Sequence, residues 1–292
     1  MENIGQYRKA GKITAEVREY GKSLIKKSSS LLEVADKIEK KISELGAEPA
    51  FPVQISCDDI AAHYCPEEDD KSVFGEQLAS LDAGIHVDGF IADTAVTVDL
   101  SGKYSDLVKS SEEALKEAIK VIQIGTPLNE IGRTIQETIE SFGFKPIRNL
   151  TGHGLDEYNV HSFPTVPNFD NKDTTPLEKG MVIAVEPFAT PGVGMIHEKG
   201  DASVFDMVGK KAVRTGFVRD IQKEIEKYNG LPFTTRWLSR KFSEPKVRYA
   251  LNQFRQLGIL RSYPPLVERS NAVVSQAEHT LLIGDKIEVL TE

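Results

Sequence analysis

Two aspartates interrupt a predicted β-hairpin in this chain of 292 residues, and their spacing indicates metal chemistry. Residues 81–98 form two apolar, strand-like runs around Asp88-Gly89, a dipeptide typical of a tight hairpin turn. With the turn centred there, Asp82 and Asp93 lie diagonally opposite on one face, at most about 7–8 Å apart. Two buried carboxylates this close repel each other, and a cation between them removes the repulsion. Considered alone, the hairpin leaves a second interpretation open, in which both aspartates face solvent on an exposed sheet.

Two further acidic residues and one histidine extend this predicted site. Glu186 follows the apolar run 181–185, and Glu278 lies just before the apolar run 280–283. An unpaired carboxylate in a core strand is costly or becomes protonated, so each of the two requires a partner. His153 lies between two glycines, which allow a partner to approach its ring. Four carboxylates and one imidazole form an oxygen-rich set that favours two divalent ions, about 3.5–4 Å apart, over a tetrahedral structural zinc.

The segments that must position these residues alternate between helical and strand-like periods. Ser30 and Glu33 match a capping box at the start of the second predicted helix. Helices followed by a hairpin occur twice, which favours α+β layers built from two duplicated halves. Helical periodicity covers 5–27, 31–45, 105–142, 219–229, 233–241 and 244–257, and strand-like runs cover 81–98, 180–187, 277–283 and 286–290.

The remaining histidines and the cysteines have simpler interpretations. His86, His197 and His279 are predicted to be structural or solvated. For His279, strand alternation points the side chain away from the face on which its neighbour Glu278 lies. The two cysteines of the chain, Cys57 and Cys65, match neither a zinc knuckle nor a redox motif, so they are predicted to be structural thiols.

Five short motifs, spread in order over nearly the whole chain, resemble the methionine aminopeptidase family. An insertion over 206–271, which contains RWL at 236–238 and YPPL at 263–266, is similar to the type 2 subfamily, and the short N-terminus is similar to its archaeal form. The five motifs are IAAHY at 60–64, LDAGIHVDGFIADTA at 81–95, TGH at 151–153, AVEPF at 184–188 and QAEHT at 276–280.

This resemblance implies the α+β "pita-bread" fold, in which two related halves clasp a dinuclear metal site. The catalytic domain would consist of residues 1–205 and 272–292. Residues 206–271 would form a helical, winged-helix-like insertion.

The resemblance also assigns metal-binding roles. Asp82 would bind one metal ion, and Asp93 and Glu278 would bridge the two ions. His153 and Glu186 would bind the second ion. Carboxylate and imidazole ligands accept Co, Mn, Fe or Zn, so the pattern implies two divalent ions without selecting the element.

The activity implied is the hydrolytic removal of the N-terminal methionine from nascent proteins, with a small uncharged second residue preferred. Glu186 would move a proton from the attacking water to the leaving amine, and His63 and His161 would donate hydrogen bonds to the reacting carbonyl. Phe51 and Tyr263 would wall the methionine pocket, and His63 and His161 would also bind substrate.

Two other functions remain alternatives. An X-Pro dipeptidase or aminopeptidase P uses the same five ligand types but adds a separate N-terminal domain, and only 62 residues precede His63 here. A catalytically inactive relative that binds protein or RNA would have lost metal ligands, and all five are present.

The net charge of −8 conceals two opposed regions. Residues 206–271 contain 14 basic and 6 acidic residues, a net of +8, whereas the rest contains 22 basic and 38 acidic residues, a net of −16. A basic insertion on an acidic enzyme suggests contact with ribosomal RNA near emerging N-termini, or equally that the insertion docks against the acidic body.

Composition sets the expected location and class. With 40% apolar and 27% charged residues, the chain is too apolar for intrinsic disorder. It has neither a signal-peptide pattern nor an apolar run of the roughly 20 residues that span a membrane. We therefore expect a cytoplasmic protein without membrane or DNA partners, and the family resemblance implies a monomer whose partners are nascent N-termini.

Overall fold

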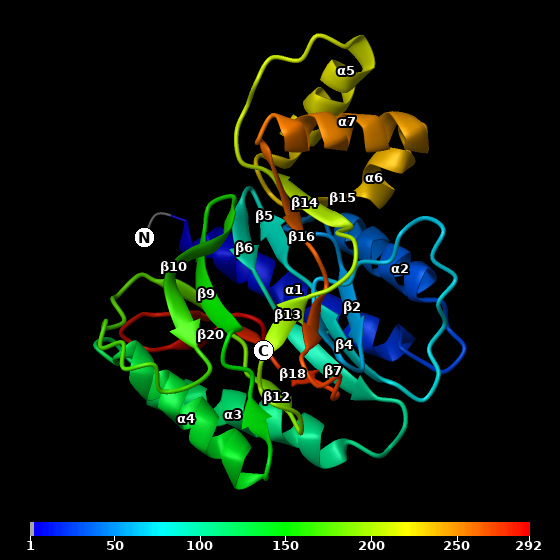
Figure 1. The fold of residues 1–292 in the computed structure, drawn as a ribbon. Coiled ribbons are helices and arrows are strands. Elements are labelled where there is room, and N and C mark those ends of the chain that lie inside the picture. The colour runs from blue at the N-terminus through cyan, green and yellow to red at the C-terminus, as the bar shows by residue number, and fades with distance from the viewer. Residues whose placement is uncertain (1–2) are drawn as a thin grey trace.

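Two pairs of helices cover the sheets of the main body, one pair in each half of the chain (Figure 1). The structure is a computed structural model that describes residues 3–292. Helices α1 and α2 pack on the strands of the first half, α3 and α4 mainly on those of the second, and each half has its own buried apolar cluster. This repetition matches the duplicated halves expected from the sequence. The body helices are α1 (Ile4–Leu24), α2 (Leu31–Glu44), α3 (Ser105–Val121) and α4 (Leu128–Ser141).

The strands pair antiparallel in six small sheets within the described residues. The largest has the order β10-β9-β11-β19-β20, so it joins the middle of the chain to its C-terminal end. The strands of the body are β1 (Glu48–Pro49), β2 (Gln54–Cys57), β3 (Ile60–Ala62), β4 (Leu78–Asp82), β5 (Ile85–Val87), β6 (Phe90–Ala92), β7 (Ala95–Asp99), β8 (Lys145–Pro146), β9 (Thr151–Asp156), β10 (Asn159–Pro167), β11 (Val182–Val185), β12 (Phe188–Thr190), β13 (Ile196–Glu198), β17 (Leu266–Glu268), β18 (Ser275–Gln276), β19 (His279–Leu282) and β20 (Glu288–Val289).

The predicted hairpin turn is present between β5 and β6. Asp88 and Gly89 both have positive φ, 54° and 90°, as a two-residue turn that matches the strand twist requires. The same register continues into the pair β4 and β7, where Asp82 lies opposite Ala95. Asp93 occupies the short gap between β6 and β7, on the same hairpin as Asp82.

The helix boundaries differ little from those expected. The Ser30 hydroxyl accepts a hydrogen bond from the backbone N–H of Glu33 at 3.3 Å, which confirms the predicted N-cap of α2. The Glu33 carboxylate lies 3.7 Å from the ammonium of Lys37, so this half of the capping box is an ion pair along the helix instead.

The basic insertion forms a three-stranded sheet beside helices α5, α6 and α7, seen at the top of Figure 1. It has a separate buried apolar cluster. The helix predicted over 233–241 begins instead as a strand, because its first residues pair with β14. The elements are β14 (Val204–Met207), α5 (Gly216–Ile225), a 3₁₀ turn (Glu226–Tyr228), β15 (Phe233–Thr234), α6 (Thr235–Ser239), α7 (Glu244–Gln256) and β16 (Leu260–Tyr263).

The expected limits of the insertion, 206–271, include strand β17, which pairs with β13 and β3 of the body. Strand β14 begins before residue 206 and pairs with β15 and β16. We therefore propose that the insertion subdomain spans 204–263, with the catalytic domain on both sides of it.

Among residues 3–292, no helix combines the length and the apolar character that a membrane crossing demands.

Candidate metal centre

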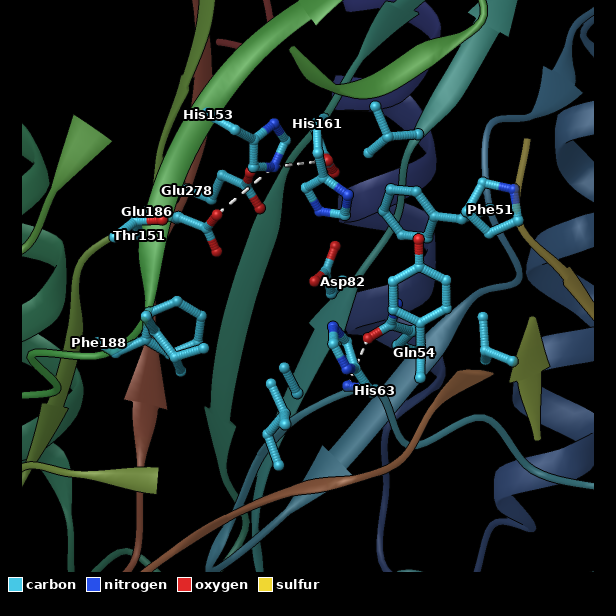
Figure 2. A pocket seen from close by; sticks show the side chains of 18 of the residues that line it. Phe51, Gln54, His63, Asp82, Thr151, His153, His161, Glu186, Phe188 and Glu278 are labelled. Carbon is cyan, nitrogen blue, oxygen red and sulfur yellow. Dashed lines mark hydrogen bonds and ion pairs between the residues drawn. The ribbon is translucent and has the colours of Figure 1, made fainter. Parts of the chain in front are cut away.

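The nine side chains singled out from the sequence line one cavity of about 240 Å³ in the main body. They come from both halves of the chain and from the edge of the insertion. Figure 2 shows His153, Glu186 and Glu278 turned toward one another, with His63 on the other side of the cavity and Asp82 between. The nine are Phe51, His63, Asp82, Asp93, His153, His161, Glu186, Tyr263 and Glu278.

The predicted ligands converge from separate strands. His153 lies in β9, while Glu186 follows β11 and Glu278 precedes β19. The Nε2 atom of His153 lies 3.5 Å from a Glu186 oxygen and 3.9 Å from an Asp93 oxygen. One ligand atom each from Asp93, His153 and Glu278 lies within 4.8 Å of the others, close enough to hold an ion.

The orientation of His153 suits a metal ligand. Its Nδ1 atom lies 3.3 Å from the carbonyl of Gly154, and because a carbonyl only accepts, Nδ1 carries the proton. Nε2 is then the atom with the free lone pair, and it faces Asp93 and Glu186. Burial, and secondarily the nearby His161, lowers the pKa of His153 to about 3, so the ring is neutral at physiological pH.

Two of the buried carboxyl groups have oxygens that no described donor satisfies. Both oxygens of Glu278 and one of Asp82 are buried without a hydrogen-bond partner among the described residues. Burial raises the pKa of Asp82 to about 7. Burial and then mutual repulsion raise the pKa values of Asp93, Glu186 and Glu278 well above normal. Unpaired acceptors with a shared preference for positive charge fit divalent cations, which this oxygen-rich donor set binds well.

Glycines beside His153 explain why the sequence folds this way locally. A Cβ on Gly152 would overlap the carbonyl of Ala184 in β11, and a Cβ on Gly154 would overlap the carbonyl of Phe163 in β10. Strand β9 therefore fits between its two neighbours only with glycine on both sides of the histidine. This close approach brings His153 against the end of β11, where Glu186 begins the next segment.

His63 occupies a constrained position on the opposite wall. Its φ of 67° is in the left-handed region, which costs a non-glycine residue roughly 1–2 kcal/mol. The side-chain oxygen of Gln54 accepts its backbone N–H at 2.7 Å and holds this conformation. Its Nδ1 atom lies 3.3 Å from the carbonyl of Pro264, so Nδ1 is the protonated nitrogen. Burial, and then His161, lowers its pKa to about 4, so His63 is neutral.

Tyr263 separates His63 from His161. Its ring contacts that of His63 edge-on at 5.5 Å and lies 6.4 Å from that of His161. The Tyr263 hydroxyl donates to Asp206 at 2.9 Å, and Arg261 pairs with the same carboxylate. Desolvation, and then the Arg261 charge, lowers the pKa of His161. Both histidines therefore face the cavity as neutral rings.

Several polar residues of the site were given no role from the sequence: Gln54, which holds His63, and Asn149 line the cavity, and Gln276 contacts one of its acids. The side-chain amide of Gln276 donates to Glu186 at 3.4 Å, and its hydrogen bonding also lowers the pKa of Asp82 against the effect of burial. A buried glutamine in a strand, two residues before Glu278, was the available signal. The cavity is otherwise completed by residues such as Val204 and Pro232, for which no sequence pattern indicated a role.

The residues predicted to be structural lie outside this cavity. His86 is buried and accepts the backbone N–H of Gly89, while His279 hydrogen-bonds Thr291 on another side of its strand. Cys57 and Cys65 are both free thiols, and burial raises their pKa values to about 12 and about 11. These observations agree with thiols that do not act as nucleophiles.

Comparison with known proteins gives consistent results. Residues 5–215 match metallopeptidase family M24. The chain is 44% identical over 295 residues to a methionine aminopeptidase of Methanocaldococcus jannaschii, covering 100% of this chain and 99% of that protein. The solved methionine aminopeptidase of Thermotoga maritima has a TM-score of 0.73 at 23% identity, covering 100% of this chain and 97% of that chain. A prolidase from Pyrococcus furiosus has a TM-score of 0.65 at 19% identity, and this chain covers 64% of it while matching over its own full length. The two structural similarities confirm the predicted pita-bread fold.

Proposed function

The chain belongs to metallopeptidase family M24, and from this premise we propose that it is a methionine aminopeptidase. It is a metal-dependent hydrolase that removes methionine from the N-termini of nascent polypeptides. The observation that carries the proposal is the convergence of four buried carboxyl groups and one neutral imidazole in a single cavity. A preference for a small uncharged second residue remains part of the proposal.

The metal centre would be held by the five predicted ligands. Divalent ions bound there supply Lewis acidity and lower the pKa of water, which makes a nucleophile available near neutral pH. Asp82 would contact one ion, His153 and Glu186 the other, and Asp93 and Glu278 both. The orphaned oxygens of Glu278 and Asp82 support this assignment, because no described residue hydrogen-bonds to them.

Glu186 would carry the proton of the reaction. One of its oxygens faces His153, and the other accepts a hydrogen bond from Gln276. We assign it the transfer of a proton from the attacking water to the departing amine nitrogen, as the carbon–nitrogen bond of the substrate breaks.

The geometry separates the roles of the two histidines. His63 donates its Nδ1 proton to Pro264, so the neutral ring presents Nε2 as an acceptor for a substrate N–H. This differs from the expectation that both histidines donate to the reacting carbonyl. His161 has no such carbonyl partner within residues 3–292, and we assign it as the donor for the developing negative charge.

An apolar wall would bind the methionine side chain. Phe51, Phe188 and Tyr263 line the cavity together with Leu266. The unbranched thioether of methionine adapts well to such an irregular apolar space. The cavity volume of about 240 Å³ also supports selection of one side chain of moderate size.

A metal-dependent peptide assay distinguishes this function from its alternatives. We expect Met-Ala-Ser to lose its methionine when a divalent metal is added and Ala-Pro dipeptide to remain intact. Cleavage of only Ala-Pro would support a prolidase, although this chain spans only 64% of the P. furiosus prolidase. Cleavage of neither peptide by metal-loaded protein would support a binding module.

We also propose that the enzyme is a cytoplasmic monomer that contacts the ribosome through its insertion. Arg219, Lys223, Lys246 and Arg255 are exposed on or beside α5 and α7 and form no ion pair with described residues. Reversing three of these charges (K223E, K246E and R255E) should weaken co-sedimentation with ribosomes and its salt dependence. K12E, at an exposed lysine of α1, provides the control. Sedimentation insensitive to both salt and charge reversal would contradict the contact.

A further inference from the structure

Arg18 of α1 ends in a buried polar cluster on another side of Asp93 and Glu278. It lines a second cavity, of about 270 Å³, to which Glu278 and His279 also contribute. Its side chain is only 14% exposed, although its ion-pair partner Glu19, 3.1 Å away, is an exposed acid. Its Nη1 atom lies 3.1 Å from the Thr94 hydroxyl, 2.9 Å from the Thr291 carbonyl and 3.3 Å from Nδ1 of His279.

The contact with Thr94 connects Arg18 to Asp93 and Glu278, the two predicted bridging ligands. Arginine has no acceptor, so the Thr94 hydroxyl accepts from Arg18 and donates its own proton to the Glu278 carbonyl at 2.9 Å. The backbone N–H of Thr94 donates to a carboxylate oxygen of Asp93 at 2.9 Å. One threonine therefore connects Arg18 to the backbone of one acid and the side chain of the other.

The other two contacts reach Asp93 through the C-terminal segment. Nη1 of Arg18 carries two hydrogens, which the Thr94 hydroxyl and the Thr291 carbonyl accept, and the Thr291 hydroxyl lies 2.8 Å from Nδ1 of His279. That hydroxyl accepts the backbone N–H of Thr280 at 3.1 Å. The Thr280 hydroxyl in turn accepts from the N–H of Asp93 at 2.7 Å and donates to its carbonyl at 2.8 Å.

This cluster is important because no side chain among the described residues orients the Glu278 carboxylate. Within residues 3–292 both of its oxygens lack a hydrogen-bond donor, so its direction depends on its backbone and on the ion it would hold. The backbone is fixed by the Thr94 hydroxyl and by the bond from its own N–H to the Ala95 carbonyl at 3.1 Å.

We propose that Arg18 is a positioning residue of the metal centre, which fixes the Thr94 and His279 segments so that Asp93 and Glu278 converge on the ions. The inference rests on the proposed function, because it assumes that those two carboxylates bind metal. Residues that orient metal ligands through hydrogen bonds, without touching the metal, typically contribute about 10–100-fold to metal affinity.

The test measures binding of Co²⁺ alone to chelator-treated protein, by calorimetry and by the visible absorption of the bound ion. R18M should raise the dissociation constant for Co²⁺ at least tenfold and change the absorption spectrum of the bound ion. R18K retains the positive charge but not the planar group of hydrogen-bond donors, so we expect an intermediate loss of Co²⁺ affinity. The matched control is R8M, since Arg8 also joins α1 to the C-terminal segment, through an exposed ion pair with Glu288. It should bind Co²⁺ within about twofold of the wild type.

The outcomes separate this inference from the function on which it rests. If the wild type binds Co²⁺ and folded R18M binds it equally well, Arg18 has no positioning role and the function stands. If the wild type binds no Co²⁺, both proposals are overturned. If R18M does not fold, as judged by circular dichroism, R18K decides, and wild-type affinity and spectrum in that variant would overturn the inference.

Discussion

Burial prepares His153 and Glu278 for metal binding in opposite ways. His153 is oriented by a direct hydrogen bond to the Gly154 carbonyl, and burial keeps its ring neutral with a free lone pair. Glu278 receives no donor at its carboxylate, and burial with repulsion from Asp93 and Glu186 favours its protonated form. A cation reverses this preference, because it supplies the positive charge that the neighbouring side chains do not.

Metal binding should therefore release protons. In metal-free protein the pKa of Asp82 is raised to about 7, and those of Asp93 and Glu278 are raised well above normal, so some of these carboxyl groups are protonated at pH 7. An incoming ion displaces those protons, so affinity should decrease as the pH is lowered from 8 to 6. Calorimetry at pH 7 in two buffers of different ionisation enthalpy measures the number released. A value of zero would show that the cluster is already ionised.

His161 provides a test of the proposed division between metal binding and catalysis. Its ring lies 4.7 Å from that of His153, but it is not among the predicted ligands. H161A should leave metal content unchanged and lower kcat by about tenfold or more, as expected for loss of a donor to the reacting carbonyl. Steady-state kinetics with Met-Ala-Ser and metal analysis of the same sample measure both effects. An unchanged kcat would remove His161 from the mechanism.

At the level of elements, strand β9 depends on close backbone packing. It lies between β10 and β11, and residues on either side of His153 face the backbones of those neighbours. The hairpin that contains Asp82 and Asp93 is a second rigid element, whose two positive-φ turn residues fix its register. The proposed metal site is therefore formed by residues within strands or directly beside their ends, and rigid strands place side chains more accurately than loops do.

G154A should consequently lower the free energy of unfolding by at least about 1–3 kcal/mol, because its Cβ would overlap the Phe163 carbonyl. Urea denaturation measures the change. G5A is the control, since Gly5 lies in α1 with no heavy atom near the added methyl group. That substitution should be neutral or stabilise by up to about 1 kcal/mol. Equal stability of the two variants would contradict the packing argument.

At the level of the whole molecule, the acidic body and the basic insertion are joined by a buried ion cluster. Arg236 is fully buried and pairs with Asp36 and Glu39 at 2.6 Å, while Arg240 pairs with Asp36 and Glu68 at 2.7 and 2.8 Å. Two of the cations in the insertion therefore dock it against the body, and others remain exposed. The docking interpretation and the ribosome interpretation thus concern different residues of one insertion.

Removing the buried charge should weaken this junction strongly. R236M leaves Glu39 buried without its cationic partner and with only the indole N–H of Trp237 as a donor, so the free energy of unfolding should fall by about 3–5 kcal/mol. R248A, which removes an exposed ion pair within α7, should cost no more than about 0.5 kcal/mol. Urea titrations of both variants give the comparison, and Co²⁺ affinity should be retained in each. A small effect of R236M would show that the junction is held by apolar packing.

Much of the candidate site could be predicted from the local sequence alone. The turn at Asp88-Gly89 determined the hairpin register, because positive φ at two successive positions admits few turns, and that register placed Asp82 and Asp93 on one face. Acids embedded in apolar strands were equally visible from sequence, since burial of an unpaired carboxylate is unfavourable in any fold.

Only the tertiary structure decided the features that depend on residues distant in the chain. The proposed acceptor role of His63 rests on the carbonyl of Pro264, about 200 positions later, and the hydrogen bond of Gln276 joins it to Glu186, which follows strand β11. The docking of Arg236 on α2, and the inclusion of β17 in the body, likewise arise from pairing across the chain. Local periodicity and turn chemistry act between near neighbours, whereas hydrogen-bond direction and buried ion pairing depend on which distant groups the fold brings into contact.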